Sequence, residues 1–345
     1  MSDGRSAVRN VLAVISPHVG GRSTGAALAG LVPGARVTVV ESADEDPAAL
    51  REAHAIITGL APVTAAHIAA APALELVQCA SHGHDYVDLE AARARSVTVC
   101  NIGSSGAEAQ NVAEQTFALM LALAKQVVPA HNALTEADWA LPRLQRSLTE
   151  LSGKTLGIVG LGHIGREVAR RALVFDMRVV YTGRNRAAAD TEARLGDARF
   201  LPLDELLRVS DYVSLHAPLT PETRHLLDAG RLALLRPTAF LVNTARGALV
   251  DQDALADALT AGALAGAGID VFDPEPPTAA LRLLRAPNVV LSPHVAGVTR
   301  ETLVRIALAA VQNVVDHLDG KPLRDVVHED VPHASRLPLR ADCAT

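Results

Sequence analysis

Short apolar runs alternate with alanine- and leucine-rich stretches along most of this 345-residue chain. In the first hundred residues, apolar runs of strand length predict strands at 8–15, 37–40, 55–58, 74–79 and 97–100. A second series predicts strands at 155–159, 178–182, 212–215, 239–243, 266–270 and 289–291. Because strands that alternate with helices form parallel sheets covered by helices, the pattern predicts an α/β fold with two parallel-sheet domains.

Two long helical segments stand apart from these series. The first runs from about 107 to 128, and its second half is apolar nearly all round. Such a helix must be buried on more than one side, so we interpret it as a helix between domains or between subunits. The last helix is expected at about 300–318, whereas 129–150 and the tail from Lys321 are predicted to be irregular or loose.

A glycine-rich segment follows the first strand of the second series. It reads Gly160-Leu161-Gly162-His163-Ile164-Gly165, and a helix is expected after it over about 166–175. Glycines permit the tight turn, the approach of a pyrophosphate and the close packing of helix on strand, and the helix N-terminus offers N–H groups to phosphates. This context predicts a dinucleotide site, and a glycine turn without a ligand is the less favoured alternative.

Three further motifs come at the ends of later strands in the same series. They contain Arg246 in Asn-Thr-Ala-Arg-Gly, Glu275 in Asp-Pro-Glu-Pro, and His294 in Ser-Pro-His-Val-Ala-Gly. Parallel α/β sheets bind their ligands at the carboxyl ends of their strands, so these side chains are expected at one crevice. Arg can bind a carboxylate and polarise a carbonyl, His can transfer a proton, and Glu can orient the imidazole and favour its charged form.

The composition excludes several classes of partner. A formal net charge of -6 argues against nucleic acid, which binds basic surfaces. The three cysteines lack C-x-x-C spacing, so they predict no disulfide framework and no metal site, and they favour a cytoplasmic location. The longest apolar run, 117–124, is far shorter than the roughly 20 residues that span a bilayer, so no membrane partner is expected.

From about residue 55 to 321 the chain resembles the D-isomer-specific 2-hydroxyacid dehydrogenase family. The resemblance rests on motifs in the family's order: 83–89, 111–114, 153–155, the glycine turn, 216–220 and the three strand-end motifs. It implies two Rossmann-like or flavodoxin-like domains with a deep cleft between them. Residues 1–102 and 298–345 would form the substrate-binding domain and 103–297 the dinucleotide-binding domain, with a homodimer built on the latter.

The same resemblance implies roles for individual residues. Arg246, Glu275 and His294 would be the catalytic set, and Asp270 would hold the nicotinamide amide. Backbone N–H groups of Ser81, His82 and Gly83 would bind the substrate carboxylate together with Arg246 and His294. Cofactor contacts are expected from Gly160, Gly162, His163, Ile164, Gly165, His216, Pro218, Thr223, Thr244, Ala245, Asp270 and Gly297.

The implied reaction is reduction of a small 2-oxo acid, such as glyoxylate, hydroxypyruvate or pyruvate, with a proton from His294. Phosphoglycerate-type relatives carry a basic residue where this chain has Gly59-Leu60-Ala61, which disfavours a phosphorylated substrate. His82 and His84 stand where relatives usually have small or aliphatic residues. His82 is either a solvated loop residue or a contact for a second polar group of the substrate, which would make a dicarboxylate or phosphono acid possible. Trp139 either closes the pocket from a partner subunit or packs the linker. Two alternatives remain: a phosphite- or phosphonate-type donor, and a nucleotide-sensing protein like the family's corepressors.

The cofactor prediction rests on the segment after the strand at 178–182. NAD-specific enzymes of this fold place an acidic residue there to hold the ribose 2′-hydroxyl, and this chain has Gly183. Arg184 can pair with a 2′-phosphate, and Thr182 and Asn185 can hydrogen-bond it. The sequence therefore predicts that NADP(H) is preferred and that NAD(H) is possible; the alternative is that the arginines are solvated and the choice is indifferent.

Overall fold

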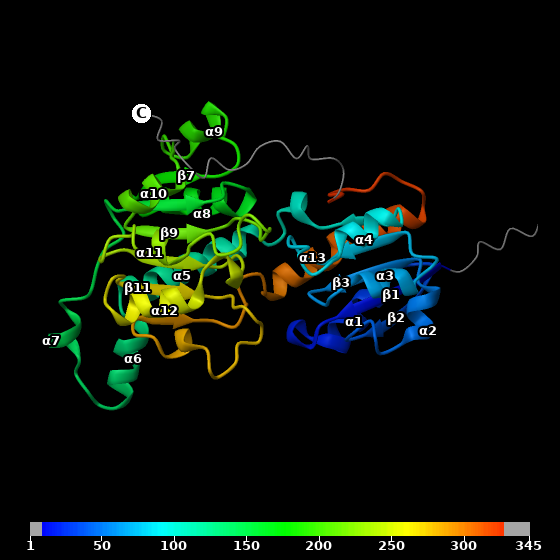
Figure 1. The fold of residues 1–345 in the computed structure, drawn as a ribbon, viewed down its shortest axis with the longest axis horizontal. Helices are drawn as coiled ribbons and strands as arrows, with labels where there is room; N and C mark the ends of the chain where they lie inside the picture. The colour runs from blue at the N-terminus through cyan, green and yellow to red at the C-terminus, as the bar shows by residue number, and fades with distance from the viewer. Residues whose placement is uncertain (1–8, 328–345) are drawn as a thin grey trace, which may run out of the picture. The chain divides into compact units, whose positions relative to one another are not determined.

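The computed structural model describes residues 9–327, which form two compact α/β units (Figure 1). One unit contains the described residues up to Glu108 and those from Thr299 on, and the other is Ala109–Val298. The chain thus passes from one unit to the other twice, after Glu108 and after Val298. That the first unit binds substrate and the second binds the dinucleotide stays a prediction.

The first unit is built on a five-stranded parallel sheet of order β2-β1-β3-β4-β5. Alternate residues of β1 enter the two cores on either side of it: Leu12 and Val14 pack with α2, α3 and α4, and Val11, Ala13 and Ile15 pack with α1 and α13. The strands are β1 (Arg9–Ile15), β2 (Ala35–Val40), β3 (Ala55–Gly59), β4 (Leu76–Cys79) and β5 (Thr98–Cys100). The helices are α1 (Gly21–Ala29), α2 (Pro47–Glu52), α3 (Ala65–Ala70), α4 (Leu89–Ala94) and α13 (Arg300–Leu318).

The second unit is built on a seven-stranded parallel sheet of order β12-β11-β10-β9-β6-β7-β8. The chain starts in the middle at β6, builds β7 and β8 on one side and then adds β9 to β12 on the other. The order therefore reverses between β6 and β9, which is where such sheets bind their ligands. The strands are β6 (Thr155–Val159), β7 (Arg178–Thr182), β8 (Arg199–Phe200), β9 (Tyr212–Leu215), β10 (Phe240–Asn243), β11 (Gly266–Ile269) and β12 (Val289–Leu291).

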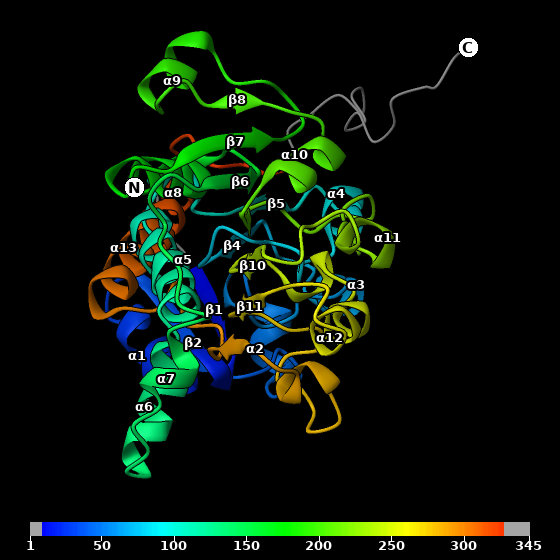
Figure 2. The same cartoon turned by 90° about the vertical axis from the view of Figure 1, so that its left-hand side faces the viewer.

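Helices cover both faces of this sheet (Figure 2). α5 and α8 pack on one face through Phe117, Met120, Val168 and Ala172, and α10, α11 and α12 pack on the other through Leu206, Leu232 and Leu255. Because helices cover both faces, the central strands of this sheet are mostly apolar, as is usual for parallel strands. The helices are α5 (Ala109–Ala124), α6 (Val127–Thr135), α7 (Leu141–Leu144), α8 (His163–Val174), α9 (Ala189–Arg194), α10 (Leu203–Val209), α11 (Ala229–Leu232) and α12 (Gln252–Thr260).

The predicted strands and the last helix are confirmed, with ends that differ by no more than two residues. The prediction misses β8, which has two residues and so no readable period. The single helix expected over 107–128 is wrong at its end, because Gln126 adopts a left-handed conformation with φ 50° and separates α5 from α6. The irregular segment expected over 129–150 is wrong in part, since it contains most of α6 and all of α7.

The segment after Lys321 is ordered as far as it is described, so the prediction of a loose tail is wrong for 321–327. The backbone N–H of Val327 donates to Val99 O at 2.8 Å, and the N–H of Asn101 donates to Asp325 O at 3.1 Å. These bonds satisfy backbone groups beside β5, the edge strand of the first sheet. The rest of the tail, from 328, lies outside the described residues.

No single helix between residues 9 and 327 is long and apolar enough to cross a membrane. α5 and α6 reach the length and composition only when taken together, and they are bent by 60° at the break between them.

Candidate active site

The glycine turn between β6 and α8 needs glycine at two positions. Gly160 has φ +102°, and a Cβ there would lie 2.7 Å from the carbonyl oxygen of His216 after β9. A Cβ on Gly165 would lie 2.1 Å from Gly160 O, so the helix can pack this close to the turn only without a side chain. The strand-turn-helix geometry that the sequence predicts is therefore present.

The start of α8 fits a phosphate. A Cβ on Gly162 would meet nothing within 4 Å, so space is open beside this backbone. Gly162 caps the helix without a side-chain hydrogen bond, and the first N–H groups of a helix, here those of His163 and Ile164, have no acceptor within it. An anion bound there would satisfy these donors and the positive end of the helix dipole.

The loop after β7 places its two arginines differently. Arg186 donates twice to the carboxylate of Glu192, at 2.9 Å each, and Glu192 also accepts the Tyr181 hydroxyl at 2.6 Å. The hydrogen bonds of Arg186 and then Tyr181 hold the pKa of Glu192 at about 2, so it stays charged. Arg184 and its neighbour Asn185 are exposed, and Thr182 is buried at the end of the strand.

His216 lies just after β9, beside the glycine turn. Its N–H donates to Val159 O at 2.7 Å, and its Nε2 lies 2.8 Å from Ser214 Oγ. Burial lowers the pKa of His216 to about 3, so its ring is neutral at physiological pH. Its Nδ1 is buried and has no hydrogen-bond partner in the described chain, which leaves one polar atom free for a bound molecule.

The other predicted cofactor residues support the loops around this edge. Thr223 is buried, and its hydroxyl donates to the carbonyl of Pro218 at 2.8 Å. Thr244, just after β10, lies 3.1 Å from the hydroxyl of Thr116 on α5, and the N–H of Ala245 donates to Asn243 Oδ1 at 3.0 Å. Gly297 follows the His294 loop, so all these residues lie at strand carboxyl ends of the second unit.

The structure brings His294 and Glu275 together. His294 Nδ1 lies 2.7 Å from Glu275 Oε2, and the other carboxylate oxygen accepts the N–H of Phe272 at 2.8 Å. The two side chains are 29% and 34% exposed, so the pair is accessible. A histidine whose Nδ1–H is held by a carboxylate presents Nε2 for proton transfer.

Arg246 completes the set from the neighbouring strand. A Cβ on Gly247 would lie 2.1 Å from the backbone of Phe272, which shows how closely the loops after β10 and β11 approach. Burial raises the pKa of Glu275, but the hydrogen bond and charge of His294 and the charge of Arg246 lower it below its ordinary value. These three residues thus form one electrostatic cluster within the second unit.

The predicted substrate residues belong to the first unit, after β4. The Ser81 hydroxyl donates to Gly83 O at 2.8 Å and lies 2.7 Å from the Tyr86 hydroxyl. The N–H of His82, expected to bind a substrate carboxylate, donates instead to Glu108 at 3.0 Å. Their role toward substrate stays a prediction.

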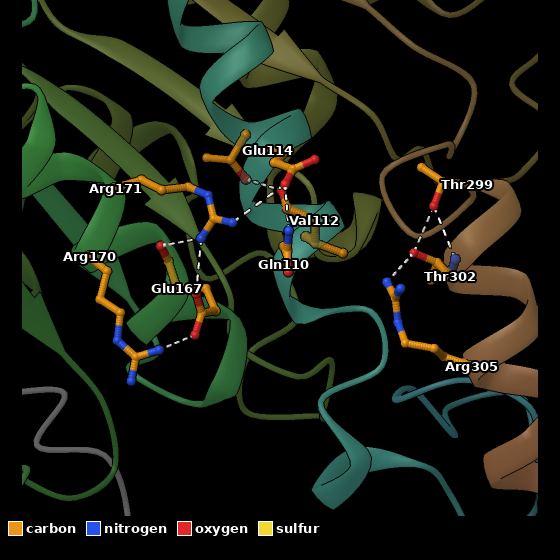
Figure 3. A network of polar contacts seen from close by, with 10 residues as sticks. Gln110, Val112, Glu114, Glu167, Arg170, Arg171, Thr299, Thr302 and Arg305 are labelled. Carbon is orange, nitrogen blue, oxygen red and sulfur yellow. Dashed lines mark hydrogen bonds and ion pairs between the residues drawn. The ribbon is translucent and has the colours of Figure 1, made fainter.

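Glu114, from the motif at 111–114, has a structural role (Figure 3). Arg171 of α8 lies 3.5 Å from Glu114 and 3.0 Å from Glu167, which ties α5 to the helix of the glycine turn. Figure 3 also shows the start of α13, where Arg305 donates to the Thr302 hydroxyl at 3.0 Å. Arg305 also donates to Ala107 O at 3.2 Å. It thus links the segment by which the chain leaves the first unit to the helix by which the chain returns to it.

Two residues near His294 were not predicted as site residues. Ser292 donates to Asp270, and Gln115 of α5 donates to Ser292 at 3.0 Å. The position of Ser292 directly before Pro-His could have indicated a role for its hydroxyl. No local pattern indicates Gln115, because its hydrogen-bond partner lies far along the chain.

Comparisons with known proteins point to one family for this chain. The sequence model of a family described as D-isomer specific 2-hydroxyacid dehydrogenase, NAD binding domain, matches residues 117–296. The chain is 41% identical over 287 residues to a glyoxylate reductase of Aeropyrum pernix, covering 81% of this chain and 84% of that protein. It is 41% identical over 296 residues to a D-3-phosphoglycerate dehydrogenase of Mycobacterium bovis, covering 84% of this chain and 54% of that protein.

The fold is similar to that of a solved glyoxylate reductase from Paecilomyes thermophila. The TM-score is 0.79 and the identity 28%, over 93% of this chain and 98% of that one.

Proposed function

The chain belongs to the D-isomer-specific 2-hydroxyacid dehydrogenase family, and we propose that it reduces a small 2-oxo acid to the D-2-hydroxy acid with a nicotinamide cofactor. The observation that carries the proposal is the Glu275–His294 pair, 2.7 Å apart, beside the charge of Arg246. The names of similar proteins, glyoxylate reductases among them, support a 2-oxo acid as the substrate class.

In this mechanism each catalytic side chain has one task. When bound, the nicotinamide supplies the hydride that the carbonyl carbon accepts. The Arg246 guanidinium binds the substrate carboxylate and polarises the carbonyl. His294 donates a proton from Nε2 to the carbonyl oxygen, and Glu275 holds the imidazole and stabilises its charged form. The 2-oxo acid thus gains one hydride and one proton and becomes the 2-hydroxy acid.

The loop after β7 supports a preference for NADP(H). It has Gly183 where a carboxylate would repel a 2′-phosphate. Since Arg186 is paired with Glu192, the exposed Arg184 is the arginine of this loop that is available to the phosphate. NAD(H) binding stays possible, because no acidic group of the loop is needed for the rest of the cofactor site.

A small substrate is supported by the loop after β3. Gly59-Leu60-Ala61 places no cation at the carboxyl end of that strand, and Leu60 adopts a left-handed conformation with φ 54°. A phosphorylated substrate would have to find its countercharge elsewhere. Sequence identity does not separate the two classes, since a phosphoglycerate dehydrogenase and a glyoxylate reductase are equally similar to this chain.

We expect loss of absorbance at the nicotinamide band when the protein is mixed with reduced cofactor and glyoxylate, hydroxypyruvate or pyruvate. Hydroxypyruvate should have a higher kcat/KM than 3-phosphohydroxypyruvate, because the loop after β3 carries no cation for the phosphate. A higher kcat/KM for the phosphorylated acid would contradict the small-substrate proposal. Oxidation of phosphite with no reduction of any 2-oxo acid would contradict the reaction itself.

We also propose a homodimer that forms through α6 and α7. Figure 1 shows these helices apart from the seven-stranded sheet of their unit. Their apolar side chains are open to solvent: Leu134 is 59% exposed, Trp139 71% and Leu141 50%. Trp139 therefore does not pack the linker within the described chain, and large apolar side chains exposed on two successive helices favour an interaction site there.

Leu134→Glu is expected to convert a dimer into a monomer, because it places a charge in the apolar contact. Val174→Glu is the matched control, since Val174 is 81% exposed on α8 and lies outside α6 and α7. Sedimentation of the wild type and both variants measures the outcome. A monomeric wild type, or an unchanged mass in Leu134→Glu, would contradict this interface.

A further inference from the structure

The backbone at His294 is held in a conformation that it would not adopt alone. His294 has φ 52°, in the left-handed region that residues other than glycine rarely occupy. Such conformations persist only where surrounding contacts determine them, and they cluster at functional sites. The contacts that hold this loop therefore decide where the imidazole lies.

One residue provides several of those contacts. Asp270, fully buried just after β11, accepts three successive backbone N–H groups of the loop. His294 N donates to the carbonyl of Asp270 at 2.7 Å, Val295 N donates to Oδ1 at 3.0 Å, and Ala296 N donates to Oδ2 at 2.9 Å. The carbonyl of Asp270 thus holds His294 itself, and the carboxylate holds the two residues that follow it.

The carboxylate is in turn oriented by two side chains. Burial raises the pKa of Asp270, and hydrogen bonds from Ser292, Ala296 and Val295 oppose this by stabilising its charged form. Gln115 Nε2 donates to Ser292 Oγ at 3.0 Å, and the Ser292 hydroxyl donates to Asp270 Oδ1. Because the amide already donates to the Ser292 oxygen, the hydroxyl proton is directed toward the carboxylate.

The same segment after β11 also carries Glu275, the partner of His294. Glu275 is anchored through Phe272 N, two residues after Asp270. Both the imidazole and its carboxylate are thus positioned from one short stretch of chain. A shift of the His294 loop relative to that stretch changes the 2.7 Å contact between them directly.

We propose that Asp270, Ser292 and Gln115 are positioning residues that hold His294 in its left-handed conformation and keep its imidazole against Glu275. This inference rests on the proposed function, because it assigns His294 the proton transfer. In this arrangement Ser292 and Gln115 act on the reaction only through the loop.

The first test compares Ser292→Ala with Ser292→Thr. Loss of a hydrogen bond to a charged group corresponds to roughly a 10-fold or larger effect, so we expect Ser292→Ala to lower kcat by about 10-fold. KM for the cofactor should stay within about twofold of the wild type, because the glycine turn and Asp270 itself are unchanged. Ser292→Thr keeps the hydroxyl and should restore most of kcat.

Ser210→Ala is the matched control, because it also removes a hydrogen-bonded hydroxyl from the second unit. The Ser210 hydroxyl donates to Leu206 O, away from the His294 loop. We expect this variant to keep the kcat of the wild type. Equal losses in Ser210→Ala and Ser292→Ala, or full kcat in Ser292→Ala, would overturn the proposal.

The second test needs no activity. Amide hydrogen exchange of Val295 and Ala296 should be at least several-fold faster in Ser292→Ala and in the milder Gln115→Leu, with the β6 amides unchanged. If the wild type reduces no 2-oxo acid, the proposed function fails, but exchange still tests the contacts of the loop. If the wild type is active and loop exchange is unchanged in both variants, this inference alone fails. If Ser292→Ala does not fold, the same exchange measurement on Gln115→Leu tests the proposal.

Discussion

Replacing His294 with Asn is expected to lower kcat for 2-oxo acid reduction by roughly 10²-fold or more, because the group that protonates the carbonyl oxygen is lost. Cofactor affinity should be nearly unchanged, since the glycine turn and α8 do not contact this ring in any described hydrogen bond. Steady-state kinetics with saturating reduced cofactor measures kcat, and fluorescence titration of the cofactor measures its Kd.

The control for this variant is His18→Asn, which changes an exposed histidine of the first unit. It should keep the kcat of the wild type. Near-normal turnover in His294→Asn would show that another group provides the proton. Arg246→Lys should also lose activity, because lysine lacks the planar guanidinium that binds a carboxylate with two parallel hydrogen bonds.

The pH dependence follows from the same pair. Reduction consumes the proton that His294 carries, so its rate should fall as pH rises, while oxidation of the hydroxy acid should gain. Burial raises the pKa of Glu275, but the hydrogen bond and charge of His294 lower it below 4.5. A carboxyl with a lowered pKa contributes stability above its unfolded value and loses it as pH falls through the folded value. Glu275 is therefore expected to contribute stability down to acid pH and to lose this contribution as pH falls through its lowered pKa. Profiles of kcat in both directions test the rates, and the free energy of unfolding measured against pH tests this stability contribution.

Arg184→Ala is expected to reduce the preference for NADPH over NADH by roughly 10- to 150-fold, the equivalent of about 1.5–3 kcal/mol for one charge-assisted hydrogen bond. The effect should appear almost entirely in kcat/KM with NADPH, because NADH has no 2′-phosphate to lose. The measurement is the ratio of kcat/KM with the two cofactors, in the wild type and in the variant.

Arg199→Ala is the matched control, because Arg199 is an exposed arginine of the same unit on β8. It should leave the ratio unchanged. Preference for NADH in the wild type would contradict the prediction, and so would a ratio that does not move in Arg184→Ala.

Local patterns were sufficient for most of the fold. Apolar runs of three to eight residues predicted the strands, since a parallel strand covered on both faces is apolar along most of its length. The glycine turn could be recognised in the sequence because only glycine fits at Gly160, where φ is positive, and at Gly165, where the helix approaches the turn closely. Arg246, Glu275 and His294 could be chosen because polar residues at strand ends have no packing reason to be there.

Contacts between distant segments were not readable in this way. Gln115 and Ser292 are separated by 177 positions, and only the packing of α5 on the sheet brings them together. The sequence assigned the 2′-phosphate to Arg184, but it gave no sign that Arg186 is bound by Glu192, which α9 returns to the loop. The hydrophobic periodicity of an element indicates which of its sides is buried. Which polar groups of two elements meet depends on how those elements pack, and no short stretch of sequence contains that information.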